Sequence, residues 1–200
     1  ASDVYKRQAM YCYTNKILHD NGIVVTMAGD MGDEVLGGYP KYWKLRKESL
    51  KTWTDVIDKW INRIKRPIKV YDKVVLRNEM LKCYPEDLWN PNDPIGSYMA
   101  LDCVAQVPEE FLMRNDKYGM AYSMEGRFPL ATKTFMQHCM NIHSDQKIGK
   151  EKGDTKLLTK IAYKDLLPNV IINKMKTGWT VPLQHWWNKS GKANIPAMIL

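Results

Sequence analysis

Residues 23–39 read IVVTMAGDMGDEVLGGY, and this stretch decides how the rest of the chain is interpreted. Its apolar, β-branched beginning, Ile23–Thr26, predicts a buried strand. The strand ends in a glycine-rich turn that carries three carboxylates, Asp30, Asp33 and Glu34, and a helix is expected to follow. In an α/β fold, ligands bind at the carboxyl ends of strands, and clustered acids there suit a magnesium ion and its phosphates.

The same turn also has a purely structural interpretation. Asp30 and Asp33 have the spacing of a helix N-cap and its third helical residue, and Asp33 with Glu34 would complement the helix dipole. Gly37 and Gly38 would then end a short helix. Spacing alone leaves the helix cap and the metal site equally open, so the rest of the chain has to decide between them.

The composition of the chain predicts a globular, cytoplasmic protein. The chain has 200 residues, of which 44% are hydrophobic, enough for one domain with a core. It contains no run of 18 apolar residues, so we expect no membrane span, and its polar N-terminal residues lack a signal-peptide pattern. Its cysteines lie far apart and are expected to be reduced thiols: Cys12, Cys83, Cys103 and Cys139.

The net charge of +8 raises the question of a polyanionic partner. Basic residues are spread along the chain, with denser patches at 41–51, 63–73 and 147–160. Long blocks of one sign and nucleic-acid-binding signatures are absent, so we expect no nucleic-acid partner. A nucleotide substrate would equally favour basic residues around its phosphates.

The first residues suggest where the protein sequence proper begins. Residues 3–8, DVYKRQ, resemble the translation of a common sequencing-library adapter, and the chain has no initiator Met. We therefore expect residues 1–8 to be an artefact and residues 9–200 to be a fragment of a longer protein.

Hydrophobic spacing predicts a mostly helical fragment with one or two strands of a larger parallel sheet. Pro40 must kink or restart the helix in which it lies, and Pro108 is expected in the first turn of another. Gly126 and Pro129 are expected to end that second helix, which would close at Glu125. Helices are expected over 9–19, 34–48, 52–65, 70–83, 98–105, 108–124, 132–140 and 155–167.

Three later segments carry further polar residues at turns. Residues 114–129 read RNDKYGMAYSMEGRFP and combine a carboxylate, a glycine and a guanidinium. Residues 153–158 read GDTKLL and precede a Leu-Pro pair. Residues 174–182 read KMKTGWTVP, in which Lys176 stands beside a glycine–aromatic turn and could point at a phosphate. Each segment alone is a weak signal.

Taken in order, the four segments resemble the synthetase domain of glutamine-hydrolysing asparagine synthetases. That family carries Ser-Gly-Asp/Glu-Gly-x-Asp-Glu-x-Phe-Gly-Gly-Tyr after a strand, matched by Ala28–Tyr39. It carries Asp-Arg-x-x-Met-Ala-x-x-x-Glu-x-Arg-x-Pro, matched by Asp116–Pro129. Its Gly-x-x-Lys-x-x-Leu pattern is matched at Gly153 and Lys156, with Thr159 at the leucine position, and its Lys-x-Gly-Phe-x-Val-Pro pattern is matched by residues 176–182, with Trp179 for the aromatic. The likeness spans residues 10–188 and implies an α/β fold of the ATP-pyrophosphatase type (adenine-nucleotide α-hydrolase-like), with few parallel strands.

The resemblance implies an ATP-dependent ligase that makes asparagine from aspartate. In that family the carboxylate attacks the α-phosphate of ATP, which gives a β-aspartyl-adenylate and pyrophosphate. Ammonia released from glutamine in a separate N-terminal domain then attacks the acyl carbon. The implied cofactors are ATP and Mg2+, and the implied partners are aspartate, or another carboxylate, and ammonia; a homodimer is left open.

The same resemblance assigns roles to individual residues. Asp33 matches the family's metal-binding acid. Lys176 matches a lysine that offsets charge on the α-phosphate and leaving group, and so is both catalytic and ATP-binding. Glu125 matches an essential carboxylate that would orient or deprotonate ammonia. The remaining residues of the ATP site are Gly29, Asp30 and Gly32.

Departures from the family pattern leave the acceptor carboxylate open. Ala28 replaces serine, Leu36 replaces phenylalanine, and Leu130–Thr132 lacks an acid that the family usually has there. The family's pyrophosphate loop and glutaminase domain would lie upstream, so the fragment alone is expected to be inactive. An amidotransferase acting on a surface-sugar acid or peptide is one alternative, and a basic helical module that binds nucleic acid or protein is a weaker one.

Overall fold

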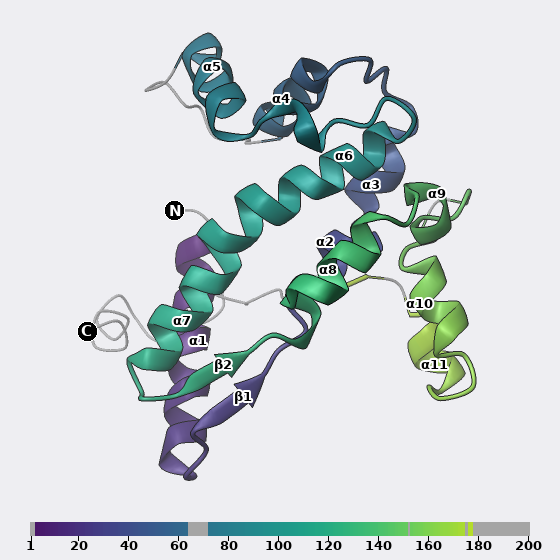
Figure 1. Ribbon diagram of the computed structural model, residues 1–200. Helices are drawn as coiled ribbons and strands as arrows, with labels where there is room; N and C mark the ends of the chain where they lie inside the picture. Colours follow the sequence, from purple (N-terminus) through teal and green to yellow (C-terminus); the bar gives the residue numbers. More distant parts are fainter. Residues whose placement is uncertain (1–2, 64–71, 152, 175, 178–200) are drawn as a thin grey trace, which may run out of the picture. The chain divides into compact units, whose positions relative to one another are not determined.

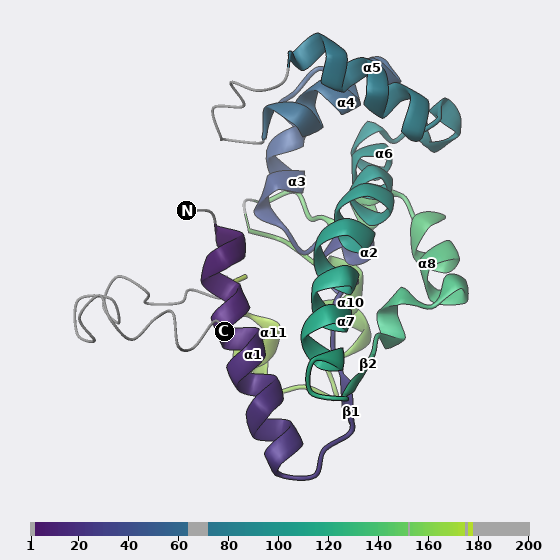
Figure 2. The same ribbon diagram turned by 90° about the vertical axis from the view of Figure 1, so that its left-hand side faces the viewer.

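The computed structural model describes residues 3–63, 72–151, 153–174 and 176–177. The chain divides into two compact units, and each is described here by itself. The first comprises residues 1–28, 109–129 and 177–200, and the second comprises 29–108 and 130–176. Figures 1 and 2 show their elements in two views. Helices predominate and one small parallel sheet is present, which is compatible with an α/β fold.

The first unit combines two helices with the sheet. α1 (Asp3–Asp20) packs against α7 (Met113–Met120), where Tyr11 stacks on Tyr118 with ring centroids 6.1 Å apart. β1 (Val25–Met27) and β2 (Glu125–Arg127) pair in parallel, with Val25 opposite Glu125. The parallel pairing predicted from the sequence is therefore present.

The burial predicted for the first strand is wrong for the chain as described. Val24 is 64% exposed and Met27 is 75% exposed. An apolar run is typical of a parallel strand covered on both faces. Within the described residues, however, the sheet has two strands, and so small a sheet leaves much of each strand uncovered.

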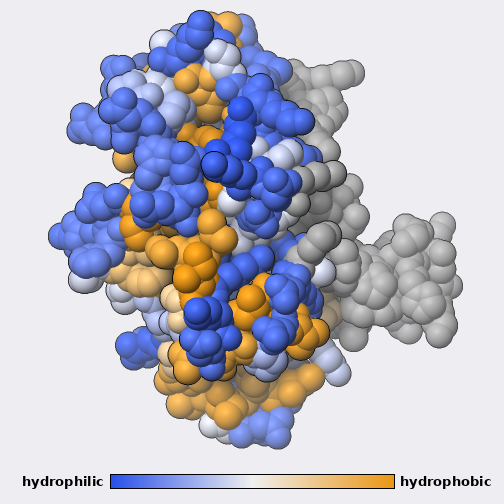
Figure 3. All heavy atoms as spheres, turned by 90° about the vertical axis from the view of Figure 1, so that its right-hand side faces the viewer, coloured by the Kyte–Doolittle hydropathy of each residue, from blue (hydrophilic) through white to orange (hydrophobic). Residues whose placement is uncertain are grey.

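The second unit is a set of short helices around one hydrophobic core. The core includes Tyr42, Ile57, Met99 and Ile148, each fully buried. Other apolar side chains of this unit, such as Leu166 and Val170, are exposed, and Figure 3 shows apolar areas set among hydrophilic ones on one face. Its helices are α2 (Gly32–Leu36), α3 (Pro40–Leu45), α4 (Trp53–Asn62), α5 (Lys73–Cys83), η1 (Glu86–Leu88), α6 (Pro94–Leu101), α8 (Lys133–Met140), α9 (Ser144–Lys147), α10 (Leu157–Ala162) and α11 (Asn169–Ile172).

Helix α4 shows how the local sequence builds this unit. Thr52 and Asp55 form a capping box, in which the Thr52 hydroxyl accepts from the Asp55 N–H and the Asp55 carboxylate accepts from the Thr52 N–H. The apolar face of α4 enters the core, and Arg77 on α5 makes a bidentate contact with Asp58 at 2.5 and 2.6 Å. Capping and amphipathic spacing together fix this helix pair.

The two prolines behave differently from each other. Pro40 is the first residue of α3, so the helix restarts there, as one of the two expected outcomes. The prediction for Pro108 is wrong: it lies inside a π-helix, η2 (Asp102–Leu112), which continues into α7. A widened π turn tolerates the missing proline N–H, so the helix does not have to begin at this residue.

Candidate functional site

The acidic turn is built around a left-handed residue rather than a capping aspartate. Met31 has φ +78° and precedes α2, so the helix begins at Gly32, and the expectation that Asp30 is its N-cap is wrong. Left-handed backbone is strained for a residue with a side chain and is often found at functional turns. Asp33 and Glu34 lie in the first turn of α2, where their charges complement the helix dipole.

Two glycines end α2, as the sequence predicted. Gly37 has φ +72°, and the N–H of Gly38 donates to the carbonyl of Asp33 at 2.7 Å. Gly38 has a second reason to be glycine, because a Cβ there would overlap the Asp33 carboxylate and the Lys156 side chain. The absence of a Cβ at Gly38 therefore lets the backbone lie close to the Asp33 side chain.

Asp33 lies between two lysines. Its Oδ1 is 2.7 Å from Lys156 Nζ, and its Oδ2 is 2.7 Å from Lys176 Nζ. Its side chain is 14% exposed. Burial raises the pKa of Asp33, but the hydrogen bonds and charges of the two lysines outweigh this effect and lower it. Asp33 is therefore held as a carboxylate.

Lys156 is a site residue that no role had been assigned to from the sequence. It is the second left-handed residue near the site, with φ +53°, and its N–H donates to the Gly37 carbonyl at 3.3 Å. Backbone and side chain are thus both fixed beside Asp33. The available signal in the sequence is its position in the segment 153–158, as the lysine of the Gly-x-x-Lys pattern.

A pocket of about 230 Å³ lies beside these groups. Four ammonium groups and two hydroxyls from different turns line it together with Asp33, and an apolar wall closes one part. Such a set of donors is suited to an anion with several oxygens, such as a polyphosphate. The basic and hydroxyl residues are Lys156, Lys160, Lys174, Lys176, Thr155 and Thr159, and the apolar ones are Leu167, Ile171 and Ile172.

The donor set also fits Mg2+ that is shared with phosphates. Among the described residues there is no group of three or more acidic, histidine or cysteine side chains that would hold a metal by themselves. Magnesium, however, is usually bound through one or two carboxylates while phosphates and waters complete its shell. Asp33 at the wall of a lysine-lined pocket meets that requirement.

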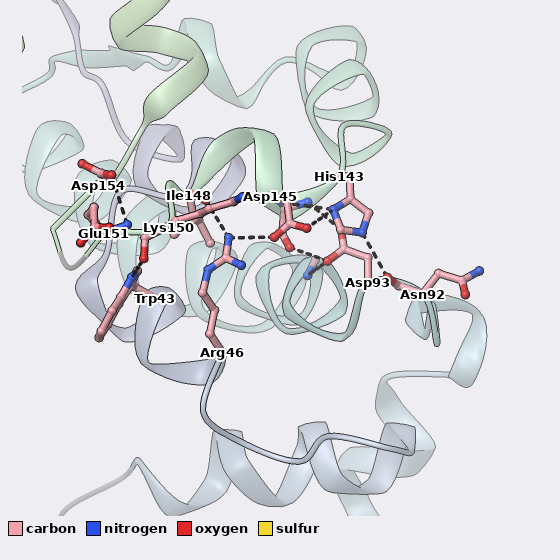
Figure 4. A network of polar contacts seen from close by, with 12 residues as sticks. Trp43, Arg46, Asn92, Asp93, His143, Asp145, Ile148, Lys150, Glu151 and Asp154 are labelled. Atoms are coloured by element: carbon pink, nitrogen blue, oxygen red, sulfur yellow. Dashed lines mark hydrogen bonds and ion pairs between the residues drawn. The ribbon is translucent and has the colours of Figure 1, made fainter.

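A polar network fixes the loop that delivers Lys156 (Figure 4). Arg46, the residue that follows α3, donates to the Ile148 carbonyl at 2.7 Å and pairs with Asp145 at 2.7 Å. Asp93 accepts from the N–H of Ser144 at 2.8 Å and from its hydroxyl at 2.6 Å. These contacts attach α9 and the residues after it to α3 and α6.

The second unit contains another carboxylate between two cations. Asp102 is fully buried, and its Oδ2 accepts from the Tyr42 hydroxyl at 2.7 Å and pairs with Lys41 at 2.5 Å. Its Oδ1 accepts from Trp60 Nε1 at 2.9 Å and from Arg63 at 2.7 Å. Nothing in the local sequence pointed to this cluster, because its members lie far apart along the chain.

Glu125 does not end a helix, and that expectation is wrong. It begins β2, its N–H donates to the Val24 carbonyl at 2.8 Å, and α7 has already ended at Met120. Pairing with β1 extends the backbone here. The Glu125 side chain is 58% exposed and pairs with Arg127 at 3.0 Å.

The structure brings two of the predicted site residues into contact. Asp33 and Lys176 are in contact within the second unit, where Asp30 is half-buried. Glu125 belongs to the first unit. A Cβ at Gly29 would meet nothing within 4 Å, and one at Gly32 would lie 2.8 Å from Leu130 Cδ1, so their predicted approach to a ligand stays a prediction. The residues 178–182 of the last motif lie outside the described part of the chain.

Comparison with known proteins adds three findings. A family model described as asparagine synthase matches residues 5–197. Asparagine synthetase [glutamine-hydrolyzing] 1 of Bacillus subtilis (strain 168) is 23% identical over 202 residues, which cover 82% of this chain. The alignment covers 32% of that relative, so the chain spans about a third of its length. No solved structure matches significantly.

Within the described residues, no helix has both the length and the apolar character needed to cross a membrane.

Proposed function

Because this chain belongs to the asparagine synthase family, we propose that it forms part of an ATP-dependent ligase that converts aspartate to asparagine. A side-chain carboxylate oxygen of aspartate attacks the α-phosphorus of ATP, and the bond to pyrophosphate breaks. Ammonia derived from glutamine then attacks the acyl carbon of the β-aspartyl-adenylate. AMP leaves, and the nitrogen loses a proton to give the amide.

The observation that carries this proposal is the lysine-lined pocket next to Asp33. Lys156 and Lys176 offset one carboxylate in the structure, and Lys160 and Lys174 line the same space. Polyphosphate oxygens would replace Asp33 as the partners of the ammonium groups. The ammonium groups would then stabilise the negative charge that develops on pyrophosphate as it leaves. A pocket that presents cations around one acid suits a reaction that releases a polyanion.

Asp33 is the residue that would hold Mg2+ once phosphates engage the lysines. The ion supplies charge neutralisation and a fixed geometry for the phosphate oxygens. In this chain, Asp30, Gly29 and Gly32 form the turn next to Asp33, and we assign them to the wall of the ATP site. For Gly29 and Asp30 this assignment rests on the family motif, and for Gly32 it rests on its position next to Asp33, because the second glycine of the motif falls on Met31.

Glu125 is proposed to orient ammonia or to accept its proton. It is a carboxylate at the start of a parallel strand and it already pairs with Arg127. A carboxylate in reach of the attacking nitrogen would make the amine a better nucleophile. We further propose that glutamine-derived ammonia and part of the ATP site come from protein outside this chain, so the chain by itself does not catalyse the reaction.

One sequence observation favours a second acceptor. Leu130–Thr132 lacks the acid that the resemblance leads one to expect after Phe128-Pro129. A family member that amidates a different carboxylate, such as a sugar acid or a peptide, would not need that residue. Family membership and the lysine pocket support either ligase over a basic module that binds nucleic acid or protein.

The test uses the full-length protein that contains this chain. With ATP, Mg2+, ammonia and a panel of carboxylates, we expect AMP, pyrophosphate and amide in equal amounts, with aspartate the best acceptor. Lys176→Met and Glu125→Ala should each lower kcat by about 10²–10³-fold. Lys150→Met removes an exposed lysine that does not line the pocket, and should leave the rate unchanged.

Two outcomes would contradict parts of this proposal. Release of ADP and phosphate in place of AMP and pyrophosphate would exclude an adenylate. Full amide synthesis by Glu125→Ala would remove the role assigned to that carboxylate, while leaving the ATP chemistry in place. A clear preference for another carboxylate over aspartate would select the second acceptor.

A further inference from the structure

Tyr39 links the acidic turn to one of the pocket lysines. It directly follows Gly38, and its hydroxyl donates to Glu34 Oε1 at 2.7 Å. Its ring centroid is 5.7 Å from Lys176 Nζ. Neither the hydroxyl contact nor the ring contact is needed to form α2 or α3, which are stabilised by their own backbone hydrogen bonds.

The Tyr39–Glu34 contact has a fixed direction. Glu34 is buried on α2, next to Asp33, and its Oε1 accepts the hydrogen bond from the Tyr39 hydroxyl. Burial raises the pKa of Tyr39, and the neighbouring Glu34 raises it further, so the hydroxyl keeps its proton. The phenol therefore donates to Glu34, and this bond fixes the position of the ring.

Two ammonium groups lie against this ring, but their charges are balanced by different acids. Lys41 Nζ is 4.7 Å from the ring centroid and pairs with the buried Asp102. Lys176 pairs with Asp33. Lys176 thus has two described contacts, one ionic and one with an aromatic ring, and two contacts define where its ammonium group lies better than one.

We propose that Tyr39, held by Glu34, is a positioning residue that orients the Lys176 ammonium group in the pocket. This rests on the proposed function, in which Lys176 contacts phosphate oxygens. When Mg2+ competes with Lys176 for Asp33, and phosphate competes with Asp33 for Lys176, the ion pair loosens and the contact with the Tyr39 ring keeps the ammonium group in place. A cation–π contact contributes about 0.5–2 kcal/mol, depending on exposure.

The alternative is that Tyr39 serves only the core. Its ring also packs against Tyr42, with centroids 5.7 Å apart. Tyr42 is therefore the matched control: it is a buried tyrosine of the same cluster, its hydroxyl bonds to Asp102, and it contacts Lys41. Loss of its hydroxyl should lower stability without affecting Lys176.

The experiment measures inorganic pyrophosphate affinity and melting temperature for the full-length protein. Tyr39→Leu should weaken pyrophosphate binding by about tenfold, because it removes the ring. Tyr39→Phe keeps the ring and loses the bond to Glu34, and should weaken binding by about two- to threefold. Glu34→Gln retains an acceptor and should bind as the wild type does, and Tyr42→Phe should melt lower with unchanged affinity.

A double-mutant cycle with Lys176→Met separates positioning from packing. If Tyr39 acts through Lys176, Tyr39→Leu has no further effect on affinity in the Lys176→Met background. The same loss in both backgrounds, or no loss in either, would overturn the positioning role. If Lys176→Met loses affinity while both Tyr39 variants bind normally, this inference fails and the proposed function stands. If the wild type itself does not bind pyrophosphate, both are wrong.

Discussion

The second unit contains two carboxylates, Asp102 and Asp33, that each contact two cations. The difference between them distinguishes a structural charge cluster from a candidate binding site. Asp102 is fully buried and receives two further hydrogen bonds, from Tyr42 and Trp60. Asp33 is 14% exposed, contacts Lys156 and Lys176, and borders a pocket. The first arrangement satisfies its charge within the protein, whereas the lysines of the second line a pocket in which we propose that a ligand binds them.

Removing the buried carboxylate Asp102 should have the largest effect, on the stability of the protein. Asp102→Ala leaves Lys41 and Arg63 close together and removes the acceptor for Tyr42 and Trp60. Removing one partner of a buried charge cluster destabilises a protein by about 3–5 kcal/mol. Denaturant unfolding of the full-length protein should show this loss. A change below about 1 kcal/mol would mean that Asp102 is not the centre of the cluster.

Removing the charge of Asp33, at the pocket, should affect function more than stability. Asp33→Asn keeps the shape of the side chain, removes its charge, and should lower the Mg2+-dependent rate of pyrophosphate release by about 100-fold. Because the lysines lose their counter-charge, the variant should bind metal-free pyrophosphate at least as tightly as the wild type. Titration calorimetry with and without Mg2+ would show this. If Mg2+ strengthened binding equally in both proteins, Asp33 would not be the metal ligand.

A third charged side chain, Lys147, is also buried, and we expect its removal to change stability by a smaller amount. Lys147 is 1% exposed, and burial lowers its pKa despite the opposing influence of Cys139, Asp93 and Cys103. Lys147→Met should therefore stabilise the protein, by about 1 kcal/mol near neutral pH. Lys150→Met, at an exposed position, should stay within about 0.5 kcal/mol of the wild type.

The pH dependence of the Lys147→Met gain follows from the direction of the pKa shift. The folded-state pKa lies below the unfolded value of 10.5, so the unfolded chain holds its proton more tightly. The penalty in the wild type is complete below the folded-state pKa and shrinks as pH rises from there to 10.5. Unfolding measured at several pH values should show the advantage of the variant declining over that range. An advantage that grew with pH would contradict the assignment.

Much of the local structure was predictable from the sequence, because local chemistry controls it. Pro40 at the start of α3, the glycine end of α2 and the spacing of α4 follow from dihedral preference, capping and periodicity. Asp33 and Lys176 were named as site residues from the motifs, and the structure brings them into contact.

Long-range contacts account for several of the errors, and a local π-helix accounts for the one at Pro108. Glu125 was placed at a helix end, but its pairing with a strand about 100 residues earlier makes it a strand residue. Pro108 was expected to begin a helix, but η2 widens to include it. Lys156 and Asp102 received no role, because what distinguishes them is a partner that is distant in sequence. Sequence patterns report on neighbours along the chain and say little about such pairs.

Gly38 gives a practical way to compare members of this family. Its hydrogen atom occupies the space next to the Asp33 and Lys156 side chains. A relative that keeps both charged residues but carries alanine or serine at this position would have to move them apart. Its pocket would then have a different charge balance even though its charged residues were unchanged. Glycine at this position is therefore a further marker of whether this pair is intact, in addition to its two charged members.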